Sequence, residues 1–220
     1  MRLILLYAVD SLVIQQTVAR HLLEVQAVRL QPTTPFTWSS GWKSPIYCDN
    51  RVTLAYPAVR TFIKEALAAV IRQQYPTADV IAGVATAGIP QGALVADALD
   101  LPYCYVRPEP KAHGMGKQIE GHLEPNQRVV VIEDLISTGG SSLKVVEALR
   151  TAGAEVLGMA AIFTYGFPQA DKNFAEKNVS LVCLSNYDAL LKEAQALNYI
   201  PADAMSSLAI WRENPAAWGV

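Results

Sequence analysis

The chain has 220 residues and a formal net charge of -2, with 51% hydrophobic and 17% charged residues. This composition is typical of a globular protein with a large core, and it excludes an intrinsically disordered chain. The mildly acidic balance argues against a protein that binds nucleic acid mainly through phosphate contacts. We therefore expect one globular domain, spanning residues 1–220, that binds no nucleic acid.

The cysteines and the apolar segments indicate the cellular compartment of the protein. Cys48, Cys104 and Cys183 are widely spaced and form no CxxC pair, which favours free thiols in a reducing compartment. The apolar start ends at Asp10 without a cleavage-site pattern, and no segment reaches about 18 uninterrupted apolar residues. The sequence thus predicts a cytoplasmic protein without a signal peptide or a membrane span.

The first part of the chain carries short elements. Asp10 and Ser11 predict the cap of a helix that ends before Pro32, and short strands are expected at 36–40 and 45–50. A turn around Gly41 separates these strands. The first 55 residues or so do not follow the pattern of the rest, and we expect them to form a small N-terminal subdomain, called the hood below.

Pro57 suits the first position of a helix, which is predicted over residues 57–74. From residue 79 onward, short apolar segments alternate with helical ones. The predicted strands are 79–84, 102–107, 128–134, 155–163 and 179–184, the predicted helices between them are 89–99 and 141–151, and two helical stretches finish the chain. This alternation predicts an α/β fold, with a central, mostly parallel sheet flanked by helices in a core of residues 56–200.

Residues 108–126 interrupt the alternation with a segment rich in glycine and proline. A loop this long inside a compact domain is usually functional or disordered. The segment carries Lys111, His113 and Lys117, so it is predicted to be a mobile lid over an anionic ligand.

The segment 129–142, VVVIEDLISTGGSS, places two acids before a loop of glycines and hydroxyl residues. Glu133 and Asp134 end a predicted strand, where ligands bind in open α/β sheets. The loop after them leads into a helix start, whose free N–H groups favour an anion. A sugar phosphate fits this order, because its phosphate can bind the loop and its hydroxyls the acids. The alternative is an ordinary acidic strand end followed by a glycine turn.

The segment 83–88, GVATAG, has the glycine spacing of a Walker A loop. Ile89 and Pro90 stand where that motif requires lysine and a hydroxyl residue, so an NTPase phosphate loop is excluded. The turn could still hold a second anion through its backbone amides, and a plain turn between strand and helix is the alternative.

The segment 129–142 closely resembles the 5-phosphoribosyl-1-diphosphate (PRPP) motif of the type I phosphoribosyltransferases. Within that family, the segment 36–51, FTWSSGWKSPIYCDNR, resembles the hood of the orotate phosphoribosyltransferases. The segment 107–114, RPEPKAHG, resembles their catalytic loop, and VATAGIP resembles their diphosphate-contacting turn. The resemblance covers most of the chain from Phe36 to Phe163 and implies the type I phosphoribosyltransferase fold.

The resemblance also implies roles for individual residues. Glu133 and Asp134 would contact the ribose hydroxyls of PRPP. The residues that follow, in the same PRPP segment, would lead into and cradle the 5′-phosphate, and they are Leu135, Ile136, Ser137, Thr138, Gly139, Gly140 and Ser141. Backbone amides of Thr86 and Ala87, with the side chains of Arg107, Lys111 and His113, would bind the diphosphate.

Orotate recognition is where this chain departs from some family members. Those members have lysines where this chain has Ser39, Ala87 and Pro108, and an aromatic pair where it has Tyr47 and Cys48. Of the remaining candidates, Lys43 in the hood would help to hold the orotate carboxylate. Ser137 would lie near the orotate ring from the other side.

The resemblance therefore implies an enzyme that transfers the phosphoribosyl group from PRPP to orotate, giving orotidine 5′-monophosphate and diphosphate in UMP biosynthesis. It implies Mg²⁺ as cofactor and a homodimer in which the catalytic loop reaches the partner's site. Lys111, His113 and Asp134 would be the catalytic residues. The alternatives are a purine phosphoribosyltransferase and a non-catalytic regulator that senses PRPP.

Overall fold

The computed structural model describes residues 11–38, 41–107, 109, 118–201 and 203–218. The helices are α1 (Ser11–Glu24), the 3₁₀ helix η1 (Asn50–Ala55), α2 (Pro57–Gln74), α3 (Gly88–Leu99), α4 (Gly140–Thr151), α5 (Pro168–Glu176), α6 (Tyr187–Ala196) and α7 (Ala204–Glu213). The strands are β1 (Val28–Leu30), β2 (Phe36–Thr37), β3 (Lys43–Ser44), β4 (Ile46–Cys48), β5 (Val80–Val84), β6 (Tyr103–Val106), β7 (Ile119–Gly121), β8 (Arg128–Ile136), β9 (Glu155–Thr164) and β10 (Leu181–Asn186).

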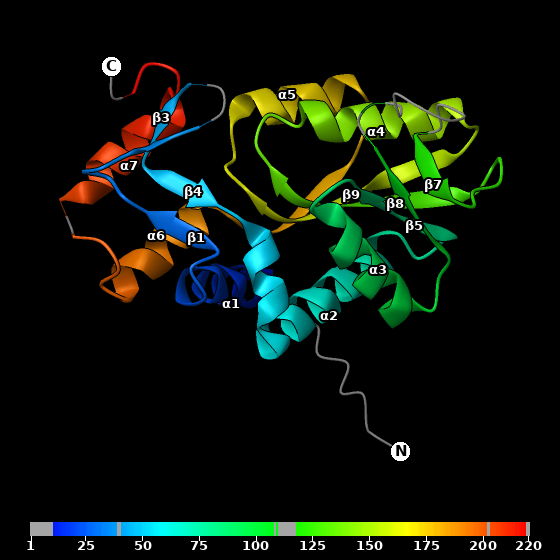
Figure 1. Ribbon diagram of the computed structural model, residues 1–220, viewed down its shortest axis with the longest axis horizontal. Coiled ribbons are helices and arrows are strands. Elements are labelled where there is room, and N and C mark those ends of the chain that lie inside the picture. The colour runs from blue at the N-terminus through cyan, green and yellow to red at the C-terminus, as the bar shows by residue number, and fades with distance from the viewer. Residues whose placement is uncertain (1–10, 39–40, 108, 110–117, 202, 219–220) are drawn as a thin grey trace.

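Six strands form the central sheet, in the order β10-β9-β8-β5-β6-β7 (Figure 1). The first five are parallel, and β7 pairs antiparallel with β6 at one edge. The chain runs from β5 to β6 on one side and then returns to β8 on the other. The order of the strands thus reverses between β5 and β8, and a ligand crevice is expected at their carboxyl ends.

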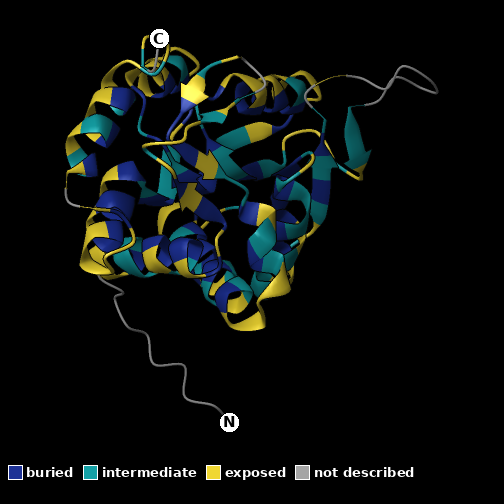
Figure 2. Ribbon diagram, turned by 60° about the vertical axis from the view of Figure 1, so that its left-hand side comes forward, coloured by how far each residue is buried: buried dark blue, intermediate teal, exposed yellow. Residues whose placement is uncertain are grey.

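Helices cover both faces of this sheet, with α1, α2 and α3 on one face and α4 and α5 on the other (Figure 1). The four residues from Val129 to Ile132 in β8 have no exposed surface, because successive side chains enter the two opposite layers of the core. Buried residues lie along the sheet and on the inner faces of the helices (Figure 2). The continuous apolar sequence of β8 is thereby explained.

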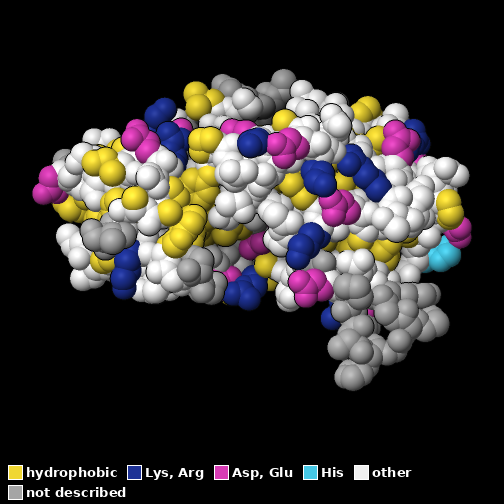
Figure 3. Space-filling view, turned by 90° about the horizontal axis from the view of Figure 1, so that it is seen from above, with side chains coloured by type: hydrophobic (Ala, Val, Ile, Leu, Met, Phe, Trp, Pro, Cys, Tyr) yellow, Lys and Arg dark blue, Asp and Glu magenta, His cyan; other side chains and the backbone are white. Residues whose placement is uncertain are grey.

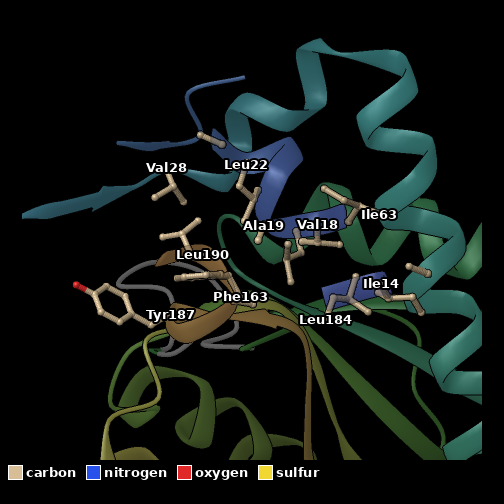
Figure 4. Close-up of a cluster of buried hydrophobic side chains, with 14 of the residues drawn as sticks. Ile14, Val18, Ala19, Leu22, Val28, Ile63, Phe163, Leu184, Tyr187 and Leu190 are labelled. Carbon is tan, nitrogen blue, oxygen red and sulfur yellow. The ribbon is translucent and has the colours of Figure 1, made fainter. Parts of the chain in front are cut away.

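The helix α1 supplies one side of the larger core cluster (Figure 4). Its buried residues include Ile14, Val18 and Leu22, at the four-residue spacing that places side chains on one face of a helix. This face packs against β10 and α6, where Leu184 and Leu190 lie in the same cluster. The predicted helix is confirmed over Ser11–Glu24, while Asp10 of its predicted cap lies outside the described residues.

The hood contains two small antiparallel sheets. β2 pairs with β3 across the turn at Gly41, whose φ of 87° lies in the left-handed region that glycine readily adopts. β4 pairs instead with β1, a strand that the sequence analysis did not anticipate. The chain then passes through η1 into α2, which spans the predicted residues 57–74.

Several elements differ from the sequence prediction. β8 continues to Ile136, two residues past the expected end, because Leu135 and Ile136 pair with Phe163 and Thr164 of β9. β7 lies inside the segment 108–126 that was expected to be a loop throughout. The helix α5 was not expected, and it follows Pro168 at its first turn.

Among the described residues, no helix combines the length and apolar character that a membrane crossing requires. On the face seen in Figure 3, Lys and Arg side chains are interspersed with Asp and Glu side chains. The three cysteines are free.

An aromatic cluster joins the C-terminal helix α7 to the hood and to the end of β9. Trp211 has no exposed surface, and its ring lies 5.7 Å from Trp38, 5.7 Å from Tyr165, 5.4 Å from Phe167 and 5.3 Å from Tyr187. Edge-to-face and tilted pairs at such distances are favourable beyond their buried area. The last helix is therefore an integral part of the packing around the hood.

We predict that Trp211→Ala lowers the free energy of unfolding by about 3–5 kcal/mol, because it leaves a large cavity in this cluster. Chemical denaturation followed by circular dichroism measures the change. The matched control is Ile210→Ala on the same helix, since Ile210 is 59% exposed. A Trp211→Ala protein as stable as the control would contradict the structural role of α7.

Candidate active site

Several of the predicted site residues lie at the carboxyl edge of three adjacent parallel strands, β6, β5 and β8. Val84 at the end of β5 pairs with Val106 of β6, and the amide of Ala85 donates to the carbonyl of Val106 at 2.9 Å. Arg107 is the next residue after β6. The structure thus brings Arg107 beside the turn that contains Thr86 and Ala87, where the Ala85–Thr86 peptide bond is cis.

The start of α3 lies directly against β8, where the two predicted acids begin. A Cβ atom at Gly88 would stand 2.5 Å from the carbonyl oxygen of Ile132 and 3.5 Å from the Cα of Glu133. Only glycine permits this approach. The turn of Thr86 and Ala87 is therefore held beside the acids, with no side-chain cap on α3 among the described residues. The backbone amides of this turn are therefore available to an anion beside the acids.

Glu133 is 6% exposed, and its carboxylate has two internal partners. The hydroxyl of Ser142 in α4 donates to Oε2 at 2.8 Å, and the amide of Asp134 donates to Oε1 at 3.0 Å. Burial raises the pKa of Glu133 well above its usual range, and the negative charge of Asp134 raises it further. The carboxylate is thus fixed toward α4 at a cost in solvation.

Asp134 is half-buried and follows Glu133 in the same strand, so its side chain points to the opposite face, toward the hood. Its carbonyl accepts a hydrogen bond of 2.7 Å from the side-chain amide of Asn50. Burial raises the pKa of Asp134, while its contact with Glu133 and the positive charge of Arg51 act in the opposite direction. Two neighbouring carboxyl groups with raised pKa values at a strand end are characteristic of a functional site.

The loop after β8 has the geometry of an anion cradle. Gly139 has a φ of 78° and stands at the N-terminus of α4, which no described side chain caps. The first N–H groups of α4 are therefore available to an anion. Ser137 is half-buried, and Thr138, Gly140 and Ser141 are exposed.

The helix α5 supports this loop from outside. A Cβ atom at Gly139 would lie 2.4 Å from the ring of Phe174, and the amide of Asn173 donates to the carbonyl of Thr138 at 2.8 Å. These contacts hold the loop against α5. Leu135 and Ile136 contribute through the backbone of β8, since their side chains pack into the core.

The remaining predicted side chains contact other groups or fall outside the described residues. The Nε of Arg107 lies 3.4 Å from Oε1 of Glu120 across β6 and β7. Lys43 is exposed in the β2–β3 hairpin, and its Nζ donates to the hydroxyl of Thr37 at 2.9 Å. Lys111 and His113 fall outside the described residues.

Four residues at this site were missed by the sequence analysis, namely Asn50, Ser142, Asn173 and Phe174. Ser142 could have been found, because it follows the predicted phosphate loop in a helix start. Asn50 lies 84 residues before its partner Asp134, and no local pattern signals their contact. Asn173 and Phe174 were missed together with α5.

We predict that Glu133→Gln stabilises the ligand-free protein at about pH 8 and that the gain shrinks toward about pH 5. The pKa of Glu133 is higher in the folded than in the unfolded chain. At a pH between the unfolded and the folded pKa, the folded state therefore binds more protons than the unfolded state. Wild-type stability therefore falls as the pH rises above about 4.3, the usual glutamate value, whereas the amide does not titrate. Urea denaturation at both pH values measures this, and a variant less stable than the wild type at the higher pH would contradict it.

Comparison with known proteins places this geometry in a family. A model of the phosphoribosyl transferase domain matches residues 54–188. The orotate phosphoribosyltransferase of Cytophaga hutchinsonii is 57% identical over 201 residues, which are 91% of this chain and 96% of that protein. The same enzyme of Listeria innocua is 58% identical over 206 residues, covering 94% and 99% of the two chains.

A solved structure agrees with these sequences. The crystal structure of orotate phosphoribosyltransferase from Aeropyrum pernix matches with a TM-score of 0.72 and 32% identity, over 84% of this chain and 99% of that one. The type I phosphoribosyltransferase fold predicted from the sequence is confirmed, as is the resemblance to this group of enzymes. The chain belongs to the phosphoribosyltransferase family and, within it, to the orotate phosphoribosyltransferases.

Proposed function

We propose how this chain carries out the reaction of its family, the transfer of the phosphoribosyl group from PRPP to N1 of orotate. The products are orotidine 5′-monophosphate and diphosphate, and the reaction belongs to pyrimidine biosynthesis. The observation that carries the proposal is the order of groups at the end of β8. Two acids, the buried Glu133 and the half-buried Asp134, stand one step before a loop that presents free helix N–H groups.

In this proposal PRPP lies across the carboxyl edge of β8, β5 and β6. Its 5′-phosphate binds the loop of residues 137–141 at the start of α4. The ribose hydroxyls donate to Asp134 and Glu133, and the diphosphate extends toward the amides of Thr86 and Ala87. Arg107 follows β6 at the same edge, where it can exchange its contact with Glu120 for the diphosphate.

Catalysis then depends on charge. The bond from the sugar to diphosphate breaks as N1 of orotate approaches, so positive charge develops on the ribose and negative charge on the leaving group. Asp134 stabilises the first, and Lys111 and His113 in the catalytic loop neutralise the second. A loop that closes over the site also excludes water, which would otherwise hydrolyse PRPP.

We assign orotate to the space between the phosphate loop and the hood. Ser137 donates to the ring from one side, and Lys43 is the hood cation assigned to the carboxylate. To reach the carboxylate, Lys43 has to break one hydrogen bond to Thr37, and that bond is exposed to solvent. The solvent-exposed pair gives up little free energy when it separates.

Mg²⁺ is the divalent cation that we assign to the reaction. Within the described residues there is no group of three or more acidic, histidine or cysteine side chains that could hold a metal ion by itself. We expect the cation to be held chiefly by diphosphate and ribose oxygens of the substrate, and we assign it no direct protein ligand. When bound, the cation neutralises charge on the diphosphate.

The working form in this proposal is a cytoplasmic homodimer of a single-domain chain, with the hood and core acting together. Free Cys48, Cys104 and Cys183 suit a reducing compartment. The catalytic loop of each subunit serves the site of its partner, so that each site takes residues from two chains.

The test of function is the choice of base. We predict that the protein consumes orotate with PRPP and Mg²⁺, and that adenine, guanine, hypoxanthine and uracil are not consumed, because the site offers cations and N–H donors to a small anion. Loss of the ultraviolet band of orotate and release of diphosphate measure the reaction. Turnover of a purine with orotate untouched would refute the assigned base and leave the fold standing.

Mixing two inactive variants tests the shared loop. We predict that Lys111→Ala and Asp134→Ala chains, inactive alone, regain activity as heterodimers, because one site then contains both wild-type residues. The control is each variant mixed with itself, and native mass spectrometry verifies heterodimer formation. Heterodimers without activity would show that each chain supplies its own loop.

A further inference from the structure

Asn50 connects the hood to the strand that carries the acids. It is the first residue of η1, has no exposed surface, and lies on the hood side of β8. Its Nδ2 donates to the carbonyl of Asp134 at 2.7 Å, which is a short hydrogen bond for an amide donor. A buried amide with such a contact to the backbone of a catalytic residue calls for an explanation beyond packing.

Asn50 contacts β8 just past the point where β8 stops pairing with β5. The register of β8 with β5 ends at Ile132, and the register with β9 pairs Glu133 with Ala161 and Leu135 with Phe163. Asp134 thus lies past the end of the ladder with β5, between two residues that pair with β9. Asn50 thus supplies a donor to the backbone of β8 beyond the end of its ladder with β5.

A second contact fixes the orientation of the Asn50 amide. The thiol of Cys48 lies 3.5 Å from Oδ1 and donates to it, so that Nδ2 is directed to Asp134. Desolvation raises the pKa of Cys48 well above its usual range, and the charges of Asp134 and Asp49 raise it further. The sulfur therefore keeps its proton and remains a donor.

The backbone of Asn50 continues the connection to the other half of the site. The hydroxyl of Thr53 donates to the carbonyl of Asn50 at 2.6 Å, and the amide of Gln91 donates to the same hydroxyl at 3.3 Å. Thr53 and Gln91 are both buried. Gln91 stands in the first turn of α3, directly after the turn that contains Thr86 and Ala87.

We propose that Asn50 is a positioning residue. It holds the backbone of Asp134 in a fixed position relative to the Thr86–Ala87 turn. It touches no substrate in this proposal and acts through the backbone of Asp134. Loss of the contact frees the end of β8 to shift, which displaces the carboxylate from the ribose. The inference rests on the proposed role of Asp134.

The variant Asn50→Leu tests this, because leucine has a similar shape and no amide. We expect kcat/KM for PRPP to fall at least about tenfold, which corresponds to about 1.4 kcal/mol of transition-state stabilisation. Activity is expressed per folded molecule. The control is Ser185→Ala on β10, which removes a buried side-chain bond to the carbonyl of Gln15 without touching β8 or Asn50, and should lower stability alone.

A double-mutant cycle separates positioning from a general structural effect. In the Asp134→Asn background, Asn50→Leu should cost about twofold or less, since the residue through which it acts is already impaired. A full loss in that background, or an Asn50→Leu protein with wild-type kinetics, would overturn the inference. Wild-type kinetics of Asp134→Asn alone would instead refute the role proposed for Asp134.

Cys48 provides an independent route if Asn50→Leu fails to fold. Cys48→Ser keeps a donor to Oδ1 of Asn50, whereas Cys48→Ala removes it. We expect the serine variant to retain the wild-type kcat/KM for PRPP within about twofold and the alanine variant to lose more. Equal kinetics of the alanine variant and the wild type would overturn the inference.

Discussion

The partial removal of two adjacent carboxyl groups from solvent at the end of β8 is the constraint on which the remaining structure depends. Charged groups lose solvation in such a place, and the raised pKa values of Glu133 and Asp134 express that loss. The fold offsets it with donors from separate elements: Ser142 from α4, and the backbone amide of Asp134 itself. In the proposed complex, sugar hydroxyls would add further donors. Repulsion between the two carboxylates is therefore strongest in the ligand-free site, and a bound ligand would reduce it.

The carboxyl edge of the sheet also requires backbone segments to approach their neighbours closely. Gly88 lets α3 reach β8, and Gly139 lets the loop lie against Phe174 of α5. Each of these contacts puts free N–H groups where an anion can meet them. In the proposed binding mode, the phosphate and diphosphate ends of one ligand lie over the ends of the adjacent strands β8 and β5. This spacing is set by the sheet, which explains how small loops can recognise an extended substrate.

The sequence predicted those parts of the fold whose signals are local. The apolar β8 followed by Glu133, Asp134 and a glycine loop was recognisable, because strand, acids and loop are contiguous. β7 was missed because glycine and proline dominate its surroundings, and α5 because its sequence is mostly polar with few buried positions. Asn50 could not be found, since its partner is distant along the chain. Lys111 and His113, with the partner's loop, remain predictions.

The aromatic cluster around Trp211 has a consequence for the order in which the protein can be completed. Trp38 belongs to the hood near the N-terminus, yet it packs against a tryptophan in the last helix. A growing chain therefore exposes Trp38 and Tyr165 until α7 has left the ribosome. Domains made during synthesis generally fold as units once their contacts are available. The hood is made early but its packing is completed only with α7, so synthesis of α7, rather than emergence of the sheet, sets the earliest moment at which the hood can close.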